Sequence, residues 1–75
     1  MLTIFPNPVS GAVTIAAASE MQQLSIFDIM GRLVASPSPA GEQVVFDTGT
    51  LPQGVYLVRA LLRDGGVRTG KVVVR

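Results

Sequence analysis

The chain is divided into short apolar runs by turn-forming residues, and this spacing constrains the fold more than any other feature. The runs are rich in Val, Ile, Leu and Phe, and Gly, Pro, Asp and Ser separate them. None approaches the roughly 20 apolar residues that a membrane-spanning helix needs. The best helix candidate, residues 16–23, is only about two turns long and too short to be stable alone. Seven strands are expected, at residues 3–5, 12–17, 23–29, 33–35, 43–47, 55–63 and 67–75.

Short strands at this spacing predict an all-β fold, a β-sandwich or a barrel. A chain of 75 residues forms a single domain, near the lower size limit for a self-sufficient core. Its hydrophobic content of 48% and charged content of 15% argue against disorder, because there is enough apolar material to offset chain entropy. The chain has no cysteine, so disulfides and thiol chemistry are excluded.

Two turns can be argued residue by residue. Pro6-Asn7-Pro8 contains two prolines that donate no backbone N–H, so this segment is expected to leave a sheet edge or to switch between sheets. Asp28 and Gly31 occupy the first and last positions of a four-residue stretch, which predicts a type I turn.

The stretch LPQGVY, residues 51–56, resembles the tyrosine corner of immunoglobulin-like sandwiches. In that corner the tyrosine hydroxyl bonds to the backbone a few residues upstream. A structural role is therefore expected for Tyr56.

The last hairpin is predicted to have a three-residue loop, Asp64-Gly65-Gly66, with a glycine in the left-handed region. Val58 would then pair with Val72, and Tyr56 with Val74. The residues expected to face the core are Tyr56, Val58, Ala60, Leu62, Val72 and Val74. The residues expected on the outer face are Leu57, Arg59, Leu61, Lys71, Val73 and Arg75. This outer face is either a solvated sheet surface or a docking surface, for which Leu57, Arg59 and Leu61 are the candidates.

The residues needed for catalysis or metal binding are scarce. There is no histidine, the commonest general base and metal ligand, and no base is placed to activate a serine. The glycines do not form a phosphate-binding loop before a helix. The five acids are scattered, at Glu20, Asp28, Glu42, Asp47 and Asp64. We therefore expect no enzyme, no metal site and no cofactor.

Binding of nucleic acid or carbohydrate is also not expected. Five of the six basic residues lie in the last two strands or the loop between them, at Arg59, Arg63, Arg68, Lys71 and Arg75. However, the chain has no tryptophan, and the outer face is expected to have no aromatic side chain on which bases could stack. The aromatic residues assigned to the core are Phe5, Phe27, Phe46 and Tyr56.

Four sequence blocks together resemble the motifs of a known family. They are PNP at residues 6–8, IFDIMGRLV at 26–34, LPQGVYLVR at 51–59 and KVVVR at 71–75. In this order and spacing they resemble the C-terminal sorting domain of the type IX secretion system of Bacteroidetes-type bacteria. The resemblance covers nearly the whole chain, from residue 4 to residue 75, although each block alone is a weak signal.

The resemblance implies a seven-stranded, immunoglobulin-like Greek-key sandwich, residues 1–75, at the end of a larger exported protein. Such a domain folds in the periplasm and carries a covalently fused N-terminal cargo. The outer-membrane translocon and its shuttle protein recognise it. A sortase-like peptidase then removes it, and the cargo is anchored at the cell surface or released.

The same resemblance implies which residues matter. The residues that match the family's recognition motifs are Gly54, Tyr56, Lys71, Val72, Val73, Val74 and Arg75. The residues that match its structural motifs are Pro6, Asn7, Pro8, Asp28 and Gly31. Two positions depart from the pattern: Phe5 stands where Tyr is frequent, and Gly70 stands where Lys is often found.

The last strand is expected to lie at a sheet edge, where unpaired backbone groups could pair with a partner. Lys71 and Arg75 would then protect that edge and mark it for an acidic receptor, or would simply complete the sandwich. An exposed edge of this kind could also pair with a second copy of the chain and give weak self-association. The alternatives to a sorting domain are a structural spacer and a sugar-binding module. Neither membrane insertion nor a nucleic-acid partner is expected.

Overall fold

The computed structural model describes residues 2–39 and 41–75, and every predicted strand is present within them. The strand ends differ from the predicted ones by no more than two residues. Residues 16–23 form no helix, because β2 ends at Ala16 and β3 begins at Met21. The elements are β1 (Thr3–Phe5), β2 (Ala12–Ala16), β3 (Met21–Phe27), β4 (Leu33–Ala35), β5 (Gln43–Asp47), a 3₁₀ turn η1 (Thr48–Thr50), β6 (Gly54–Leu62) and β7 (Val67–Val74).

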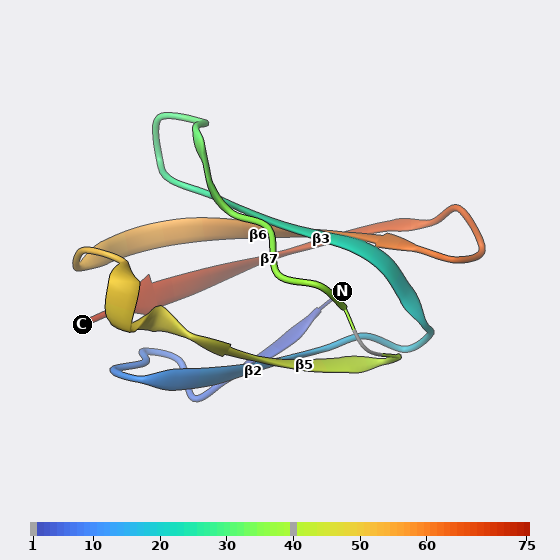
Figure 1. Cartoon of the computed structure of the whole chain (residues 1–75), viewed down its shortest axis with the longest axis horizontal. Coiled ribbons are helices and arrows are strands. Elements are labelled where there is room, and N and C mark those ends of the chain that lie inside the picture. The colour runs from blue at the N-terminus through green and yellow to red at the C-terminus, as the bar shows by residue number, and fades with distance from the viewer. Residues whose placement is uncertain (1, 40) are drawn as a thin grey trace.

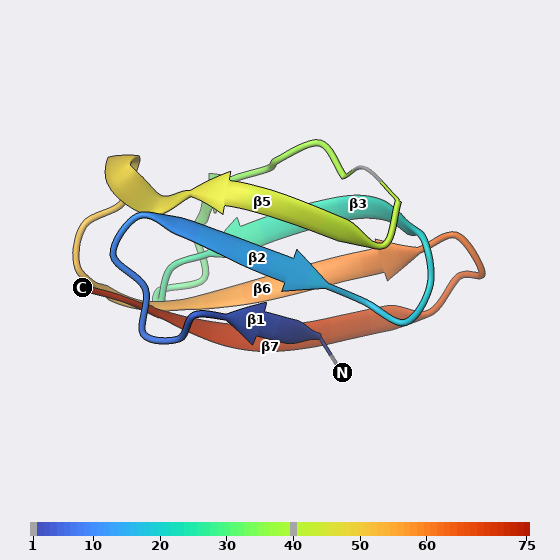
Figure 2. The ribbon, with the colours of Figure 1, turned by 90° about the horizontal axis from the view of Figure 1, so that it is seen from below.

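The strands form two antiparallel sheets packed face to face (Figure 1). One sheet has the order β1-β2-β5, and the other has the order β4-β3-β6-β7 (Figure 2). β2 pairs with β5 and β3 pairs with β6, although neither pair is consecutive in sequence. Such crossovers between sheets are Greek-key connections. The prediction of an all-β, immunoglobulin-like sandwich is confirmed.

Side chains alternate between the core and the outer surface along each long strand. In β3, Leu24 and Ile26 are buried, and in β2 Val13 and Ile15 are buried. Burying one such side chain contributes about 1.5–3 kcal/mol relative to leaving it exposed. All six residues that the hairpin was predicted to turn inward are buried: Tyr56, Val58, Ala60, Leu62, Val72 and Val74.

The pairing register of this hairpin differs from the predicted one. Tyr56 lies opposite Val72 rather than Val74, and Val58 lies opposite Gly70 rather than Val72. The shift is two residues, and side chains alternate with a period of two, so each residue keeps its predicted face.

The loop chemistry explains the shift. The three loop residues are 63–65 rather than 64–66, because the Leu62 N–H donates to the Gly66 carbonyl at 2.7 Å and closes the ladder there. The Gly65 N–H donates to the Leu62 carbonyl at 2.9 Å. Gly65, with a φ of +91°, supplies the left-handed conformation. The Asp64 Oδ1 accepts from the Gly66 N–H at 2.8 Å and so favours this loop over its neighbour.

Two leucines on paired strands test the assignment of the faces. Leu24 is 0% exposed, whereas Leu57 is 51% exposed on the outer face. We expect Leu24→Ala to lower the free energy of unfolding by about 2–5 kcal/mol, because it leaves a cavity in the core. Leu57→Ala removes the same atoms and should cost less than about 1 kcal/mol. Urea denaturation measures both, and equal losses would contradict the assignment.

Candidate recognition surface at the last strand

The segment after β1 crosses from one sheet to the other. β1 pairs with β2 in the three-stranded sheet, yet Val9 forms a parallel bridge with Val74 of β7 in the four-stranded sheet. The prediction that Pro6-Asn7-Pro8 leaves a sheet edge or switches sheets is therefore confirmed. As a result, residues 7–9 lie along the outer edge of the last strand.

Four hydrogen bonds join this segment to β7 and to Arg75, the residue that follows it. The Asn7 Nδ2 donates to the Lys71 carbonyl at 2.8 Å, and the Val73 N–H donates to the Asn7 Oδ1 at 2.9 Å. The Val9 N–H donates to the Val73 carbonyl, and the Arg75 N–H donates to the Val9 carbonyl, both at 2.8 Å. The side-chain amide of Asn7 thus takes the place of a backbone peptide group in a neighbouring strand. The last strand was expected to offer unpaired backbone groups to a partner. That expectation is wrong for the Lys71 carbonyl, the Val73 N–H and carbonyl, and the Arg75 N–H, which are all bonded within the domain.

The residues of the last strand divide by accessibility. Val72 and Val74 are buried, Val73 is half-buried, and Lys71 and Arg75 are exposed. In the folded domain a partner can therefore reach the side chains of Lys71 and Arg75, and part of Val73.

The tyrosine corner is present as predicted. Tyr56 is 5% exposed, and its hydroxyl donates to the Pro52 carbonyl at 2.6 Å. Gly54, two residues earlier, has a φ of +156°, which side-chain-bearing residues rarely adopt. Both residues therefore shape the start of β6 rather than present themselves to solvent.

The Asp28 side chain holds the turn between β3 and β4. The Gly31 N–H donates to the Asp28 carbonyl at 3.0 Å, which confirms the β-turn. The Asp28 Oδ1 accepts from the N–H groups of Met30 and Arg32 at 2.9 and 3.0 Å, and its Oδ2 accepts from the Arg32 Nε at 2.9 Å. The turn presents Ile29 and Met30, which are 76% and 78% exposed.

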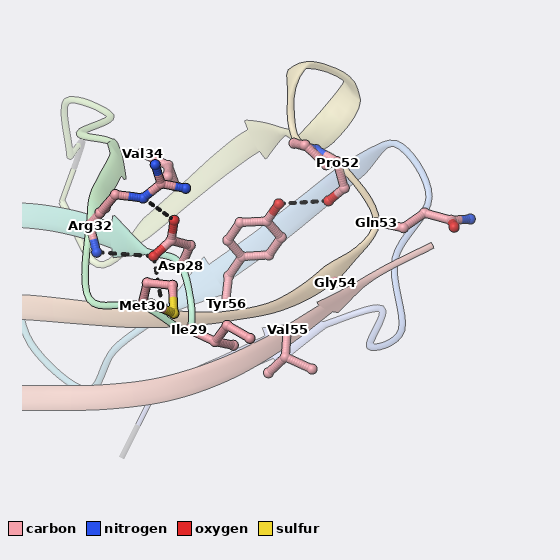
Figure 3. Close-up of a pocket in the computed structure, with 10 residues that line it drawn as sticks. All are labelled: Asp28, Ile29, Met30, Arg32, Val34, Pro52, Gln53, Gly54, Val55 and Tyr56. Atoms are coloured by element: carbon pink, nitrogen blue, oxygen red, sulfur yellow. Dashed lines mark hydrogen bonds and ion pairs between the residues drawn. The ribbon is translucent and has the colours of Figure 1, made fainter.

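A pocket of about 310 Å³ lies between this turn and the tyrosine corner (Figure 3). Two of its polar side chains already have partners: the Asp28 carboxylate accepts from Arg32, and the Tyr56 hydroxyl donates to the Pro52 carbonyl. The backbone N–H of Arg32 is the main cause that lowers the pKa of Asp28 below its ordinary value, and the Arg32 side chain and the Met30 N–H add to it. An ionised, hydrogen-bonded carboxylate of this kind is poorly suited to act as a general base near neutral pH.

Metal chemistry has no support in the described residues, which contain no group of three or more His, Cys, Asp or Glu side chains able to hold an ion. They also contain no helix with the length and hydropathy required to span a bilayer.

The outer face of the four-stranded sheet carries the three predicted docking residues. Leu57, Arg59 and Leu61 all project from the outer side of β6, away from the buried Val58 and Ala60. Leu57 lies opposite Lys71 of β7.

Sequence reasoning misplaced two of the aromatic residues. Phe27 lies opposite Leu57 and so belongs to the outer face, because Leu24 and Ile26 occupy the inward positions of β3. Phe5 is exposed. The predictions that all four aromatic residues are in the core and that the outer face has none are therefore wrong, although Tyr56 is buried and Phe46 packs against the core.

A protein-family model described as a secretion system C-terminal sorting domain matches residues 3–75. The chain belongs to this family. The resemblance to sorting domains of the type IX secretion system is thus confirmed over nearly the whole chain. A search of curated proteins finds no significant match.

The structure accounts for one departure of this sorting domain from the family pattern. A Cβ at Gly70 would lie 2.7 Å from the Ile4 Cδ1 and 3.4 Å from the Leu2 Cβ. β1 approaches β7 closely here, so a glycine fits where a lysine is often found.

The two side-chain hydrogen bonds between Asn7 and β7, which we call the Asn7 clamp, can be tested by substitution. We expect Asn7→Ala to lower the free energy of unfolding of the sorting domain by about 1 kcal/mol, because exposed hydrogen bonds contribute modestly. The Val73 amide should exchange its hydrogen faster, as measured by NMR. Gln43→Ala, an exposed change on the other sheet, is the control. Unchanged exchange at Val73 in Asn7→Ala would contradict the Asn7 clamp.

The lowered pKa of Asp28 predicts a pH-dependent contribution to stability. The unfolded chain has the ordinary pKa near 3.9, so Asp28 stabilises the fold above about pH 4 and loses this effect as the pH falls through the lower native pKa. Asp28→Asn should therefore be less stable than the wild type near pH 6. This gap should narrow at lower pH, as measured by urea denaturation. A gap that is constant or widens on acidification would contradict the assignment.

Proposed function

We propose that this domain directs an N-terminally fused cargo through the outer-membrane translocon of the type IX secretion system. Family membership supports a secretion role and export to the cell surface or extracellular space. The finer steps of the proposal are recognition of the folded domain in the periplasm by the translocon and its shuttle protein, cleavage by a sortase-like peptidase, and anchoring of the cargo.

One observation carries this proposal: the four sequence blocks meet at one end of the sandwich. Residues 7–9 bond to the last strand, and Val74 pairs with Gly54 at the start of β6. The Asp28 turn and the tyrosine corner line one pocket. In Figure 1 the C-terminus, η1 and the β3–β4 turn lie at the same end. In this proposal the signal is a folded surface assembled from these four blocks.

The proposed recognition residues take two roles. Lys71, Val73 and Arg75 have accessible side chains and would contact the translocon or its shuttle protein. The others would act by shaping the surface, since they are buried or form the corner: Gly54, Tyr56, Val72 and Val74. No catalytic role is proposed for this domain, because sorting domains of this family are generally non-catalytic.

The proposal is tested by fusing residues 1–75 to the C-terminus of a fluorescent reporter that is directed to the periplasm. We expect the reporter in the medium or on the cell surface of a type IX host, and retained in the periplasm when the translocon is deleted. Cell fractionation measures the distribution.

The matched control places the same domain ahead of the reporter rather than after it. A sorting signal should then fail, whereas a structural spacer would behave alike in both positions. Export that persists without the translocon, or retention of the correctly ordered fusion in the host that has it, would refute the proposal. Circular dichroism of each purified fusion checks that the domain is folded.

A further inference from the structure

The charged side chains on the outer face of the four-stranded sheet are all positive. Its outward-facing strand residues include two cations, Arg59 and Lys71, and a third cation, Arg75, is exposed directly after β7; the described residues of this face include no acidic side chain. The acids lie elsewhere: Glu20 pairs with Arg63 at the hairpin end, Asp28 pairs with Arg32, Asp64 is in the hairpin loop, and Glu42 and Asp47 flank or end β5. The positive charge of this face is therefore not neutralised within the domain.

Part of the same face is apolar, at the end of the sheet where β3 ends and β4 begins. Leu33, Phe27 and Leu57 lie opposite one another on β4, β3 and β6 and form a row across the sheet. Lys71 of β7 ends this row. Val55 and Val73 form the adjacent pair beside it.

The cations lie beside this apolar row on its β6 and β7 side. Arg59 follows Leu57 along β6 on the same face, Lys71 lies on the edge strand β7, and Arg75 comes directly after Val74, the last residue of β7. An apolar centre with a charged rim is the usual anatomy of a protein-binding surface. Rim charges steer a partner of opposite sign and fix its orientation.

We infer that the outer face of the β4-β3-β6-β7 sheet binds a partner protein whose surface has an apolar centre and an acidic rim. This inference rests on the proposed function, since the partner would belong to the type IX machinery. It adds the chemistry of the partner, and it adds Phe27, Leu33 and Val55 to the docking residues Leu57, Arg59 and Leu61.

The composition of this face favours a protein over other anionic partners. A lipid-binding patch typically gathers four to eight basic residues in a cluster, and a nucleic-acid groove combines cations with several aromatic platforms. Here three cations lie beside aliphatic side chains, and Phe27 is the one aromatic among the described outward-facing residues. Phosphate contacts alone would leave the apolar row unburied.

Two pairs of variants compare substitutions on the outer face with matched substitutions elsewhere on the surface. The charge pair compares Arg59→Glu combined with Lys71→Glu against Arg68→Glu, since Arg68 lies opposite Ala60 on the other side of β7 and is exposed. The apolar pair compares Leu57→Ser against Val45→Ser, since Val45 is exposed on the other sheet. All five substituted positions are exposed, so each of the four variants should fold, which circular dichroism and urea denaturation check.

The experiment measures binding of the purified domain to detergent-solubilised type IX translocon with its shuttle protein at two salt concentrations, alongside export of the reporter fusion. We expect wild-type binding to weaken as salt rises. The Arg59→Glu, Lys71→Glu variant should bind about tenfold more weakly or worse and export less reporter. Leu57→Ser should also weaken binding, and both controls should stay within about twofold of the wild type.

The outcomes distinguish this inference from the proposed function. If wild-type reporter is exported and the face variants bind and export like the wild type, the inference is overturned and the proposed function stands. If wild-type reporter is not exported, the proposed function itself fails. An equal loss in Arg68→Glu would show a general charge effect and overturn the inference. So would binding to anionic phosphatidylglycerol vesicles or to DNA that depends on Arg59 and Lys71 while translocon binding does not.

Discussion

The pairing of residues 7–9 with the last strand is the interaction on which the functional end of the molecule depends. β6 holds one edge of β7, and the Asn7 amide and the Val9 backbone hold the other. A terminal strand bonded on one side alone would fray readily, because exposed chain ends have few contacts to hold them. With both edges bonded, the exposed side chains of Lys71 and Arg75 are held on an ordered backbone.

This pairing also explains why sequence blocks far apart in the chain depend on one another structurally. Asn7 and Lys71 are 64 residues apart, yet they are hydrogen-bonded. The last strand in turn packs its buried valines beside Tyr56, whose hydroxyl fixes the corner that the Asp28 turn faces across the pocket. Damage to one block would therefore disturb the others, and a loss of export alone cannot separate recognition from folding. Variants of exposed side chains are the ones that can.

Sequence reasoning predicted what depends on local chemistry. The strand positions and their buried faces follow from a period of two and from turn formers, and the bonds of Tyr56 and Asp28 lie within four residues. The hairpin register was wrong because residues 63–65 and 64–66 both make a plausible glycine-containing loop, and the Asp64 bond to Gly66 decides between them. The Asn7 clamp had no local signal at all. Phe27 was misplaced because its aromatic character was weighed above its position between Ile26 and the turn.

Side chains alternate along β6 and β7, so that the inward ones form the core and the outward ones are available to a partner. In β6, Tyr56 and Val58 are part of the core, whereas Leu57 and Arg59, which alternate with them, are exposed and are not needed for it. An exposed apolar row contributes little to the stability of a 75-residue domain, whose inward positions already supply the core. Single exposed aliphatic residues are ordinary on any protein surface. A row of three apolar residues across adjacent strands, with Arg59 and Lys71 beside it, is not accounted for by folding. A role outside the domain accounts for both the row and its charge, and this is the physical basis for assigning the outer face to a partner.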